Sequence, residues 1–362
     1  MLDLYKLIYK SFFMKTSDVT KYDKPGFDGE KYVAKQTKAI LDRISKFKNR
    51  LYLEIWGKFL YDSHASRVLP GFFPDSKKRI FLNLKDKAEI IFCLNARDLA
   101  SNRQLSSEDI DYGDYCLKMI SDIEKEIWIR PKISINRVSL DNEIESKKYK
   151  DRLQKLGYRA YLRNEIVGYP TDVDYVLSEK WYGFDEYINV EKDLVLVTWA
   201  ASSSGKMSTC LWQIYIEQTM LHESWYAKYE TFPIWNLPLD HPVNLAYEAA
   251  TADIWDYNMM DYYHEKAYSM SSVNYNRDLE AFEIVRDLAN AFLPVDNYTR
   301  AYKSPTDMGI NTAGFCIIND DIIKQASIEE IDRRISWYQE IIDRGDGDKI
   351  WIERCQKIKE RL

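Results

Sequence analysis

The sequence predicts an α/β fold, in which a parallel Rossmann-like or P-loop-like sheet is flanked by helices and followed by a mainly helical C-terminal part. Short apolar runs alternate with helical segments over residues 30–240. This alternation is typical of parallel βαβ units. From residue 243 onward the apolar residues recur at helical spacing instead. We therefore divide the chain into an N-terminal lead-in helix (1–20), an α/β nucleotide-binding-like domain (21–240) and a mainly helical domain (241–362).

The individual elements follow from the same patterns. Strands are expected at residues 51–56, 89–94, 132–138, 158–162, 174–177, 194–197 and 226–234. Helices are expected at residues 30–47, 75–84, 109–127, 145–156, 243–254, 262–270, 278–292, 328–343 and 349–362. Gly157 stands where a glycine commonly ends a helix, and Pro233, Pro238 and Pro242 mark a loop before the helical part.

Composition and charge exclude several classes of protein. The net charge is −6 with lysines and arginines scattered, which argues against a basic face for nucleic acid. The chain has no apolar run of about 18 residues, so we expect no membrane span. Its N-terminus lacks the continuous apolar centre and small-residue cleavage site of a signal peptide. The expected partner is a small-molecule substrate, and the question of a homo-oligomer stays open.

The cysteine pattern indicates a reducing compartment. Five cysteines, an odd number, stand far apart, mostly in apolar surroundings, and none forms a CxxC pair. They are Cys93, Cys116, Cys210, Cys316 and Cys355. Such spacing fits reduced thiols, so we expect a cytoplasmic protein.

The stretch Asp193–Gln213 carries the strongest functional signal. An apolar strand runs into a loop of small residues at 200–205, and a helix beginning near Lys206 follows. Backbone N–H groups of small residues, the positive end of a helix and a lysine side chain can together hold a phosphate. The residues expected to bind the phosphate of a nucleotide are Ser202, Ser203, Ser204, Gly205, Lys206, Met207, Ser208 and Thr209.

This loop departs from the strict P-loop pattern at two positions. Ala200 replaces the first glycine, and Met207 stands where a serine or threonine would hold Mg²⁺. Ser208 or Thr209 offers a hydroxyl one or two positions later. The alternative interpretation is a tight strand-to-helix turn that binds nothing.

Several long blocks resemble one bacterial family. The blocks are GFDGEKY near residue 26, DSHASRVLPGF at 62–72, GYPTDVDYV at 168–176, SSGKMSTCL at 203–211, YETFPIWNLPLDHPVNLAYEAATAD at 229–253, VNYNRDLEAF at 273–282 and SPTDMGINTAGF at 304–315. On these blocks the chain, from about residue 22 to 334, resembles the proteins catalogued as domain of unknown function 1846.

The resemblance implies two differences between this chain and its relatives. Members of the family resemble a Gly-Pro-Gly-Ser-Gly-Lys form of the loop, whereas this chain has Ala201, Ser202 and Ser203 in place of the first three residues. Members also usually continue into a further C-terminal α/β segment, whereas this sequence stops after two charged helices. The first difference bears directly on phosphate binding.

A histidine and two arginines are further candidates for chemistry. His64 and Arg67 follow the first strand, and an imidazole titrates near neutral pH, so His64 is expected in acid–base catalysis and Arg67 in substrate binding. Arg277 can fork onto a phosphate and joins Lys206 and His64 as a candidate catalytic residue. The alternative for His64 is a loop histidine with a structural partner. The four histidines do not pair at metal-ligand spacing, which argues against a zinc site.

Two acids are candidates for Mg²⁺. Asp172 and Asp174 stand two residues apart, so an extended backbone points both carboxylates to one side. Hard oxygen ligands suit Mg²⁺, the usual companion of a bound polyphosphate. The alternative is a pair of solvated turn residues after Pro170.

Polar blocks in the helical part are candidates for the substrate side of the site. They contribute Asn274, Asn276, Asp307 and Asn311. The alternative for such residues is a local role as helix caps.

These observations lead to one expected function with two alternatives. We expect a nucleotide-dependent transferase or ligase that uses ATP, or another nucleoside triphosphate, with Mg²⁺ on a small anionic metabolite or nucleotide. The alternatives are a non-catalytic nucleotide or metabolite sensor, and an α/β enzyme whose loop binds only a substrate phosphate. Because loops at the carboxyl ends of parallel strands converge, we expect His64, Arg67, Lys206 and Arg277 to line one cleft.

Overall fold

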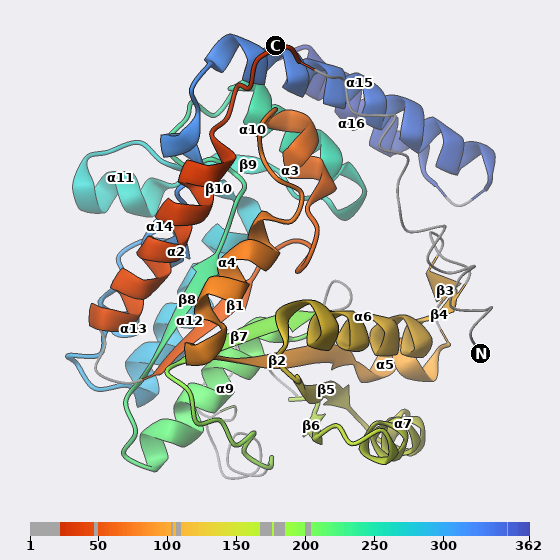
Figure 1. Cartoon of the computed structure of the whole chain (residues 1–362), viewed down its shortest axis with the longest axis vertical. Coiled ribbons are helices and arrows are strands. Elements are labelled where there is room, and N and C mark those ends of the chain that lie inside the picture. The colour runs from red at the N-terminus through yellow and green to blue at the C-terminus, as the bar shows by residue number, and fades with distance from the viewer. Residues whose placement is uncertain are drawn as a thin grey trace.

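The computed structural model is an α/β protein built on a seven-stranded sheet (Figure 1). It describes residues 22–46, 50–102, 104–105, 110–166, 176, 185–199, 204–345 and 347–362. The strand order is β11-β8-β1-β7-β2-β5-β6, and every pairing in this sheet is parallel. The predicted fold class is therefore confirmed. The expected helix at 1–20 and the expected strand at 174–177 lie outside the described residues, apart from Val176.

The strands of the main sheet are β1 (Arg50–Ile55), β2 (Ala88–Asn95), β5 (Lys132–Val138), β6 (Ala160–Asn164), β7 (Leu194–Trp199), β8 (Ser224–Tyr229) and β11 (Gly309–Ile310). Two small antiparallel ladders pair β3 (Gln104–Leu105) with β4 (Ile110–Asp111), and β9 (Asn258–Met260) with β10 (Val273–Tyr275).

The helices that the structure describes before β8 are α2 (Gly29–Lys46), α3 (Ser63–Val68), α4 (Ser76–Leu84), α5 (Ala96–Ala100), α6 (Tyr112–Ile127), α7 (Glu143–Lys155) and α9 (Lys206–Thr219). Those after it are α10 (Pro242–Ala250), α11 (Tyr262–Tyr268), α12 (Asn276–Phe292), α13 (Tyr298–Ala301), α14 (Pro305–Met308), α15 (Asp320–Asp343) and α16 (Lys349–Lys359). The described residues also form three short 3₁₀ helices, η2 (Lys85–Lys87), η3 (Ala252–Ile254) and η4 (Ala313–Cys316).

Two boundaries differ from the expectation for local reasons. β8 ends at Tyr229 rather than at residue 234, and Pro233, which has no N–H to donate to a ladder, lies in the segment that follows. α15 begins at Asp320, eight residues before the expected start at 328, because the Asn319 side chain accepts a hydrogen bond from the Ile322 N–H and so caps the helix.

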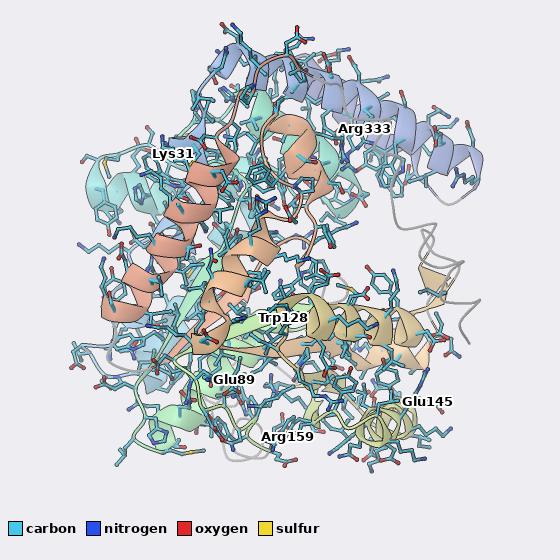
Figure 2. The ribbon with its side chains drawn as sticks, in the orientation of Figure 1. Lys31, Glu89, Trp128, Glu145, Arg159 and Arg333 are labelled. Atoms are coloured by element: carbon cyan, nitrogen blue, oxygen red, sulfur yellow. The ribbon has the colours of Figure 1, made fainter. Side chains whose placement is uncertain are left out.

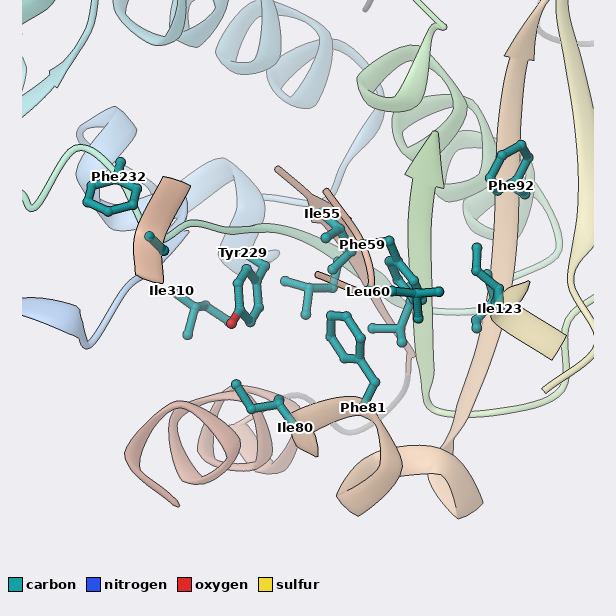
Figure 3. Packing of buried hydrophobic residues seen from close by; sticks show 14 of the residues in the cluster. Ile55, Phe59, Leu60, Ile80, Phe81, Phe92, Ile123, Tyr229, Phe232 and Ile310 are labelled. Atoms are coloured by element: carbon teal, nitrogen blue, oxygen red, sulfur yellow. The ribbon is translucent and has the colours of Figure 1, made fainter. Parts of the chain in front are cut away.

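The two faces of the sheet carry two separate hydrophobic clusters. In β1, Leu51, Leu53 and Ile55 belong to the larger cluster, whereas Tyr52 belongs to the smaller one on the other face. Figure 3 shows part of the larger cluster, including Phe59 and Phe81, whose rings stack with centroids 4.7 Å apart. Successive strand residues point to opposite faces, so the continuous apolar runs of the sequence are strands buried on both sides.

The connections after β1 and β7 leave the sheet on opposite faces. α3 and α4 follow β1 and contribute Val68 and Ile80 to the larger cluster. α9 follows β7 and contributes Leu211 and Trp212 to the smaller one. Because β1 and β7 are neighbours in the sheet, the strand order reverses here, and such a switch point is where open α/β sheets bind their ligands.

The C-terminal part shares its core with the α/β part. The larger cluster includes residues from Phe27 to Ile358, and β11 adds a strand to the edge of the sheet. Figure 1 shows α15 and α16 side by side at one end of the molecule, next to α10. All five cysteines are buried and unpaired, as expected. Among the described helices, none is both long and apolar enough to cross a membrane.

Gly71, in the segment after α3, packs against the backbone of Phe27, in the segment before α2. A side chain at position 71 would disrupt this contact. Its φ is +108°, and a Cβ built there would lie 2.1 Å from the Phe27 carbonyl oxygen. The adjacent Pro70 carbonyl accepts hydrogen bonds from the N–H groups of Gly26 and Phe27 at 2.8 and 2.9 Å.

Gly71→Ala should therefore lower the free energy of unfolding more than Gly345→Ala does. Gly345 has a similar φ of +88°, but a Cβ added there would meet no atom within 4 Å, so this position bears only the backbone cost of roughly 1 kcal/mol. The overlap at Gly71 adds about 1–3 kcal/mol. Urea unfolding of the two variants measures the difference, and equal losses would contradict the close contact.

Candidate functional site

Five buried charged residues gather at the carboxyl edge of the sheet. We call Glu54, Lys206, Lys228, Glu230 and Asp278 the edge cluster; all five are buried. They come from β1, the first turn of α9, β8, the residue after β8, and α12. Buried ionisable groups are costly unless paired, so their concentration at a switch point marks a candidate functional site.

Strand alternation places the first members of the cluster together. Glu54 follows Tyr52 by two positions and therefore lies on the face of the smaller hydrophobic cluster. Lys228 has the same relation to Tyr226 in β8. Glu54 and Lys228 are also direct partners in the parallel register of β1 and β8, so they stand next to each other on one face.

Lys206 and Glu54 form an ion pair enclosed by aromatic rings. The Lys206 Nζ lies 3.2 Å from the Glu54 Oε1. It also lies 4.6 Å from the centre of the Trp56 ring and 5.0 Å from that of Trp199. The Tyr226 hydroxyl donates to the Glu54 Oε2 at 2.6 Å, and burial raises the pKa of this tyrosine well above its usual value. Tyr226 therefore stays a donor and holds the carboxylate in place.

The second half of the cluster contains one lysine and two acids. The Lys228 ammonium donates to the Asp278 carboxylate. Burial raises the pKa of Glu230 well above its usual value, and the neighbouring Asp278 raises it further. Glu230 therefore keeps its proton over a pH range in which exposed glutamates are ionised. An acid that is neutral at such a pH can donate a proton to a bound molecule.

The start of α9 is fixed by the neighbouring strands β5 and β6. Asn136 Nδ2 donates to the Ser204 carbonyl at 2.6 Å and to the Thr209 Oγ1 at 3.1 Å. Arg163 donates to the same Thr209 Oγ1 at 3.0 Å, and Thr209 donates to the Gly205 carbonyl at 2.8 Å. The Thr209 hydroxyl is thus fully used within the protein and does not replace the missing metal-binding hydroxyl of the P-loop pattern.

Gly205 is required by the backbone of this turn. Its φ is +79°, and a Cβ there would lie 3.1 Å from the Asn136 Nδ2. A left-handed conformation in tight contact with a neighbouring side chain favours glycine. Lys206 is then the first residue of α9, and its side chain reaches β1.

Two buried hydrogen-bond donors, one close to Lys206 in space and one close to it in sequence, have no acceptor among the described residues. They are the Ser204 hydroxyl, two residues before Lys206, and the Trp56 Nε1, in a ring that Lys206 covers. Buried polar groups are almost always hydrogen-bonded, so each such exception needs an explanation. Two donors without an acceptor, together with the ammonium group of Lys206, fit an anionic ligand.

The structure describes Met207 and Ser208 in the first turn of α9, both half-buried, with Met207 packed against the smaller hydrophobic cluster. Ser202, Ser203, Asp172 and Asp174 lie outside the described residues.

His64, Arg67, Lys206 and Arg277 do not share one set of contacts, unlike the single cleft that we expected. His64 and Arg67 both bind Glu330 of α15, at 3.3 and 2.7 Å. Arg277 pairs with Asp256 at 2.5 Å and donates to the Ile254 carbonyl at 2.6 Å. His64, Arg67 and Arg277 therefore have their partners outside the edge cluster.

Aromatic rings occupy the space between His64 and Lys206. The His64 ring packs on Phe232, Phe232 stacks on Tyr247, Tyr247 packs on Tyr275, and Tyr275 packs on Trp56. Neighbouring centroids along this row are 5.3–5.6 Å apart. His64 and Lys206 therefore lie at the two ends of a packed aromatic row.

The polar residues expected on the substrate side have local partners. The Asn274 side chain accepts from the Tyr275 N–H, and the Asn276 side chain accepts from the Tyr257 N–H. Asp307 completes a capping box with Ser304, and Asn311 donates to the carbonyls of Thr231 and Pro233. The alternative role as caps and turn residues thus describes their contacts in this structure.

Of the edge cluster, only Lys206 is among the site residues expected from the sequence. Glu54 and Lys228 each interrupt an otherwise apolar strand, in LYLEIW and WYAKYE. A charged residue within a strand that is buried on both faces is a usable signal, because it must find a partner inside the protein. Asp278 gives a weaker signal, since an acid in the first turn of a helix commonly serves the helix itself.

The fold and the edge cluster define an α/β protein whose buried lysines and acids meet at the switch point of a parallel sheet. A family model described as "Domain of unknown function DUF1846, N-terminal" matches residues 25–362. The chain belongs to this family.

Relatives in three bacterial genera are named UPF0371 proteins. The chain is 43% identical over 309 residues to UPF0371 protein DIP2346 of Corynebacterium diphtheriae, covering 85% of this chain and 61% of the relative. It is 42% identical over 321 residues to a UPF0371 protein of Streptococcus sanguinis (88% and 63%) and 40% identical over 337 residues to one of Clostridium botulinum (93% and 66%). The chain thus spans between three fifths and two thirds of the length of these relatives.

The protonation of Glu230 should be visible in the pH dependence of stability. The pKa of Glu230 is raised in the folded protein, so the folded state binds more protons than the unfolded state above the unfolded pKa of a glutamate. The stability from this carboxyl is fully present below about pH 4.3 and is lost as the pH rises.

Glu230→Gln removes this dependence, so the variant should gain stability relative to wild type as the pH rises above about 5, by up to about 1.4 kcal/mol per pH unit. Urea unfolding at several pH values measures this gain. Glu280→Gln, at an exposed position of α12, is the control and should show a constant difference. A constant difference for Glu230→Gln as well would argue against a protonated Glu230.

Proposed function

We propose that this protein is an enzyme that binds a phosphate-bearing small molecule at the edge cluster, and that it uses ATP or another nucleoside triphosphate with Mg²⁺ for transfer to, or ligation of, a small anionic metabolite. The observation that carries the proposal is a pair of buried donors without an acceptor among the described residues: Trp56 Nε1, in the ring next to the Lys206 ammonium, and Ser204 Oγ, two residues before Lys206. All three groups suit the oxygens of a phosphate.

The residues of the site divide into two roles. Lys206 and the first N–H groups of α9 bind the phosphate, because a cation and a helix N-terminus both favour negative charge. Glu230, whose pKa burial raises well above its usual value, is positioned in the edge cluster as an acid, and its neighbour Asp278 is held by Lys228. Catalysis of phosphate chemistry depends mostly on such positioning and charge stabilisation.

Glu54 is the carboxylate of the edge cluster that is available to Mg²⁺. Among the described residues, no three His, Cys, Asp or Glu side chains gather as a metal site. Mg²⁺ is commonly held by one or two carboxylates together with phosphate oxygens, and Glu54 would be that carboxylate here. Bound there, the ion would neutralise negative charge on the phosphate.

A second candidate is an enzyme of this fold that binds only a substrate phosphate, without nucleotide. The observation that favours it is the fate of the metal-binding hydroxyl of the P-loop pattern in the described first turn of α9. Met207 occupies its position, and the Thr209 hydroxyl already binds Gly205, Asn136 and Arg163. We place either enzyme in the cytoplasm on the support of its five unpaired thiols.

Removal of the Lys206–Glu54 pair tests the proposal. The double variant Lys206→Met/Glu54→Gln removes both charges together, which avoids leaving one buried charge without a partner. We expect its affinity for ATP with Mg²⁺ to fall at least tenfold, as measured by isothermal titration calorimetry. Conversion of ATP to ADP or AMP, tested with a panel of small anionic metabolites, then identifies turnover.

The control is Lys38→Met/Asp42→Asn, which removes an exposed ion pair of the same charge from α2. It should bind ATP as the wild type does. Binding of ATP by the edge variant with unchanged affinity would refute the role of Lys206. Binding of a phosphate monoester without any binding of ATP would select the second candidate.

A further inference from the structure

Three arginines surround a single carboxylate between α3 and α15. Glu330 accepts hydrogen bonds from Arg67 at 2.7 and 3.1 Å, from Arg333 at 2.6 and 2.8 Å, and from Arg334 at 2.9 Å. His64 Nδ1 lies 3.3 Å from the same carboxylate. We call Arg67, Arg333 and Arg334 the arginine cluster.

The sequence of α15 produces this arrangement directly. Residues 330, 333 and 334 are three and four positions apart, so their side chains share one face of the helix. Arg67 is in the last turn of α3, and α3 packs against α15. Figure 2 labels Arg333 on α15.

The arginine cluster carries two positive charges more than its carboxylate balances. Three guanidinium groups are permanently charged, and Glu330 supplies one negative charge. The bonds from Arg333 and His64 outweigh burial and hold the pKa of Glu330 well below its usual range, so that charge is always present. Burial lowers the pKa of His64, so its ring is neutral near pH 7.

Other ion pairs of the described chain are balanced differently. Lys206 faces Glu54, and Lys228 faces Asp278 with Glu230 beside it. Arg361, by contrast, faces two carboxylates, those of Asp240 and Glu248. Among the described residues, the three arginines have no ion-pair partner other than Glu330.

The donors that remain suit a doubly charged anion with several oxygens. A guanidinium has five N–H groups, and Glu330 accepts two from Arg67, two from Arg333 and one from Arg334. The Arg333 side chain is 27% exposed, so the cluster reaches solvent on that side. An excess of two positive charges on partly buried side chains carries a desolvation cost, and a dianion would neutralise it. Planar guanidinium forks match phosphate oxygens in particular.

We propose that Arg67, Arg333 and Arg334 form a second anion site, which binds a phosphate dianion, either inorganic phosphate or the phosphate group of a small monoester. The site is separate from the edge cluster: it is built on α3 and α15, whereas Lys206 is on α9. Glu330 spaces the three guanidinium groups and competes with the ligand for them. The proposal is independent of the proposed function.

The competing interpretation is a purely structural clamp between α3 and α15, and the two interpretations predict opposite effects of Glu330→Gln. Removal of the carboxylate charge should tighten phosphate binding at least threefold if the cluster is an anion site, because the competing negative charge is gone. A clamp would only be weakened and would bind no phosphate. Arg333→Gln, at the partly exposed position, should weaken binding at least tenfold, and Arg333→Lys should lie between it and the wild type.

Isothermal titration calorimetry with inorganic phosphate and with methyl phosphate measures these affinities and separates the two ligand sources. Arg344→Gln is the control, since Arg344 is exposed and follows the end of the same helix. Titration of Lys206→Met/Glu54→Gln, in which the edge site is removed, should retain the phosphate response. Loss of that response there, with full binding in Arg333→Gln, would overturn the second site.

Absence of phosphate binding in the wild type would also overturn the proposal. If Glu330→Gln does not fold, the comparison of Arg333→Gln with Arg333→Lys and Arg344→Gln decides: equal affinities in all three would again overturn it.

Discussion

The ion pair between Lys206 and Glu54 joins the start of α9 to β1. α9 follows β7, and β7 and β1 are adjacent strands whose connections leave the sheet on opposite faces. The ion pair places a charge from β1 and a charge from the start of α9 in one buried environment, where each depends on the other. Lys228, Asp278 and Glu230 surround the same point and must be arranged so that no charge is left without a partner. The requirement for charge balance at this edge therefore constrains β1, β8, α9 and α12 at once.

Much of the fold could be predicted from local patterns. The apolar runs at 51–56 and 194–197 correspond to β1 and β7 because these strands are buried on both faces and must be apolar throughout. The predicted helix ends agree less well with the structure than the predicted strands do. α15 begins at Asp320 because of a cap at Asn319, a local feature that an apolar period does not contain.

The composition of the site was harder to predict because its members are brought together by register. Glu54 and Lys228 stand next to each other only when β1 and β8 are neighbours, and those strands are far apart in sequence. His64 and Arg67 were expected beside Lys206 because they follow a neighbouring strand. The aromatic row from Phe232 to Trp56 fills that space instead, and α15 provides their partner, Glu330.

The two sets of cations differ in what their carboxylates do. The edge cluster has three acids and two lysines, and burial raises the pKa of one of the acids, Glu230. At the arginine cluster the single acid is outnumbered. The protein as a whole is negatively charged, so neither arrangement follows from overall composition.

The shared core also has a consequence for biosynthesis. Phe27 pairs with Ile317 in an isolated bridge, and the larger hydrophobic cluster contains residues from Phe27 to Ile358. The ribosome synthesises the chain from the N-terminus, so α2 and β1 leave the ribosome long before the C-terminal residues that pack against them. The apolar surface of these N-terminal segments stays exposed in the meantime, and exposed apolar surface makes a nascent chain prone to aggregation.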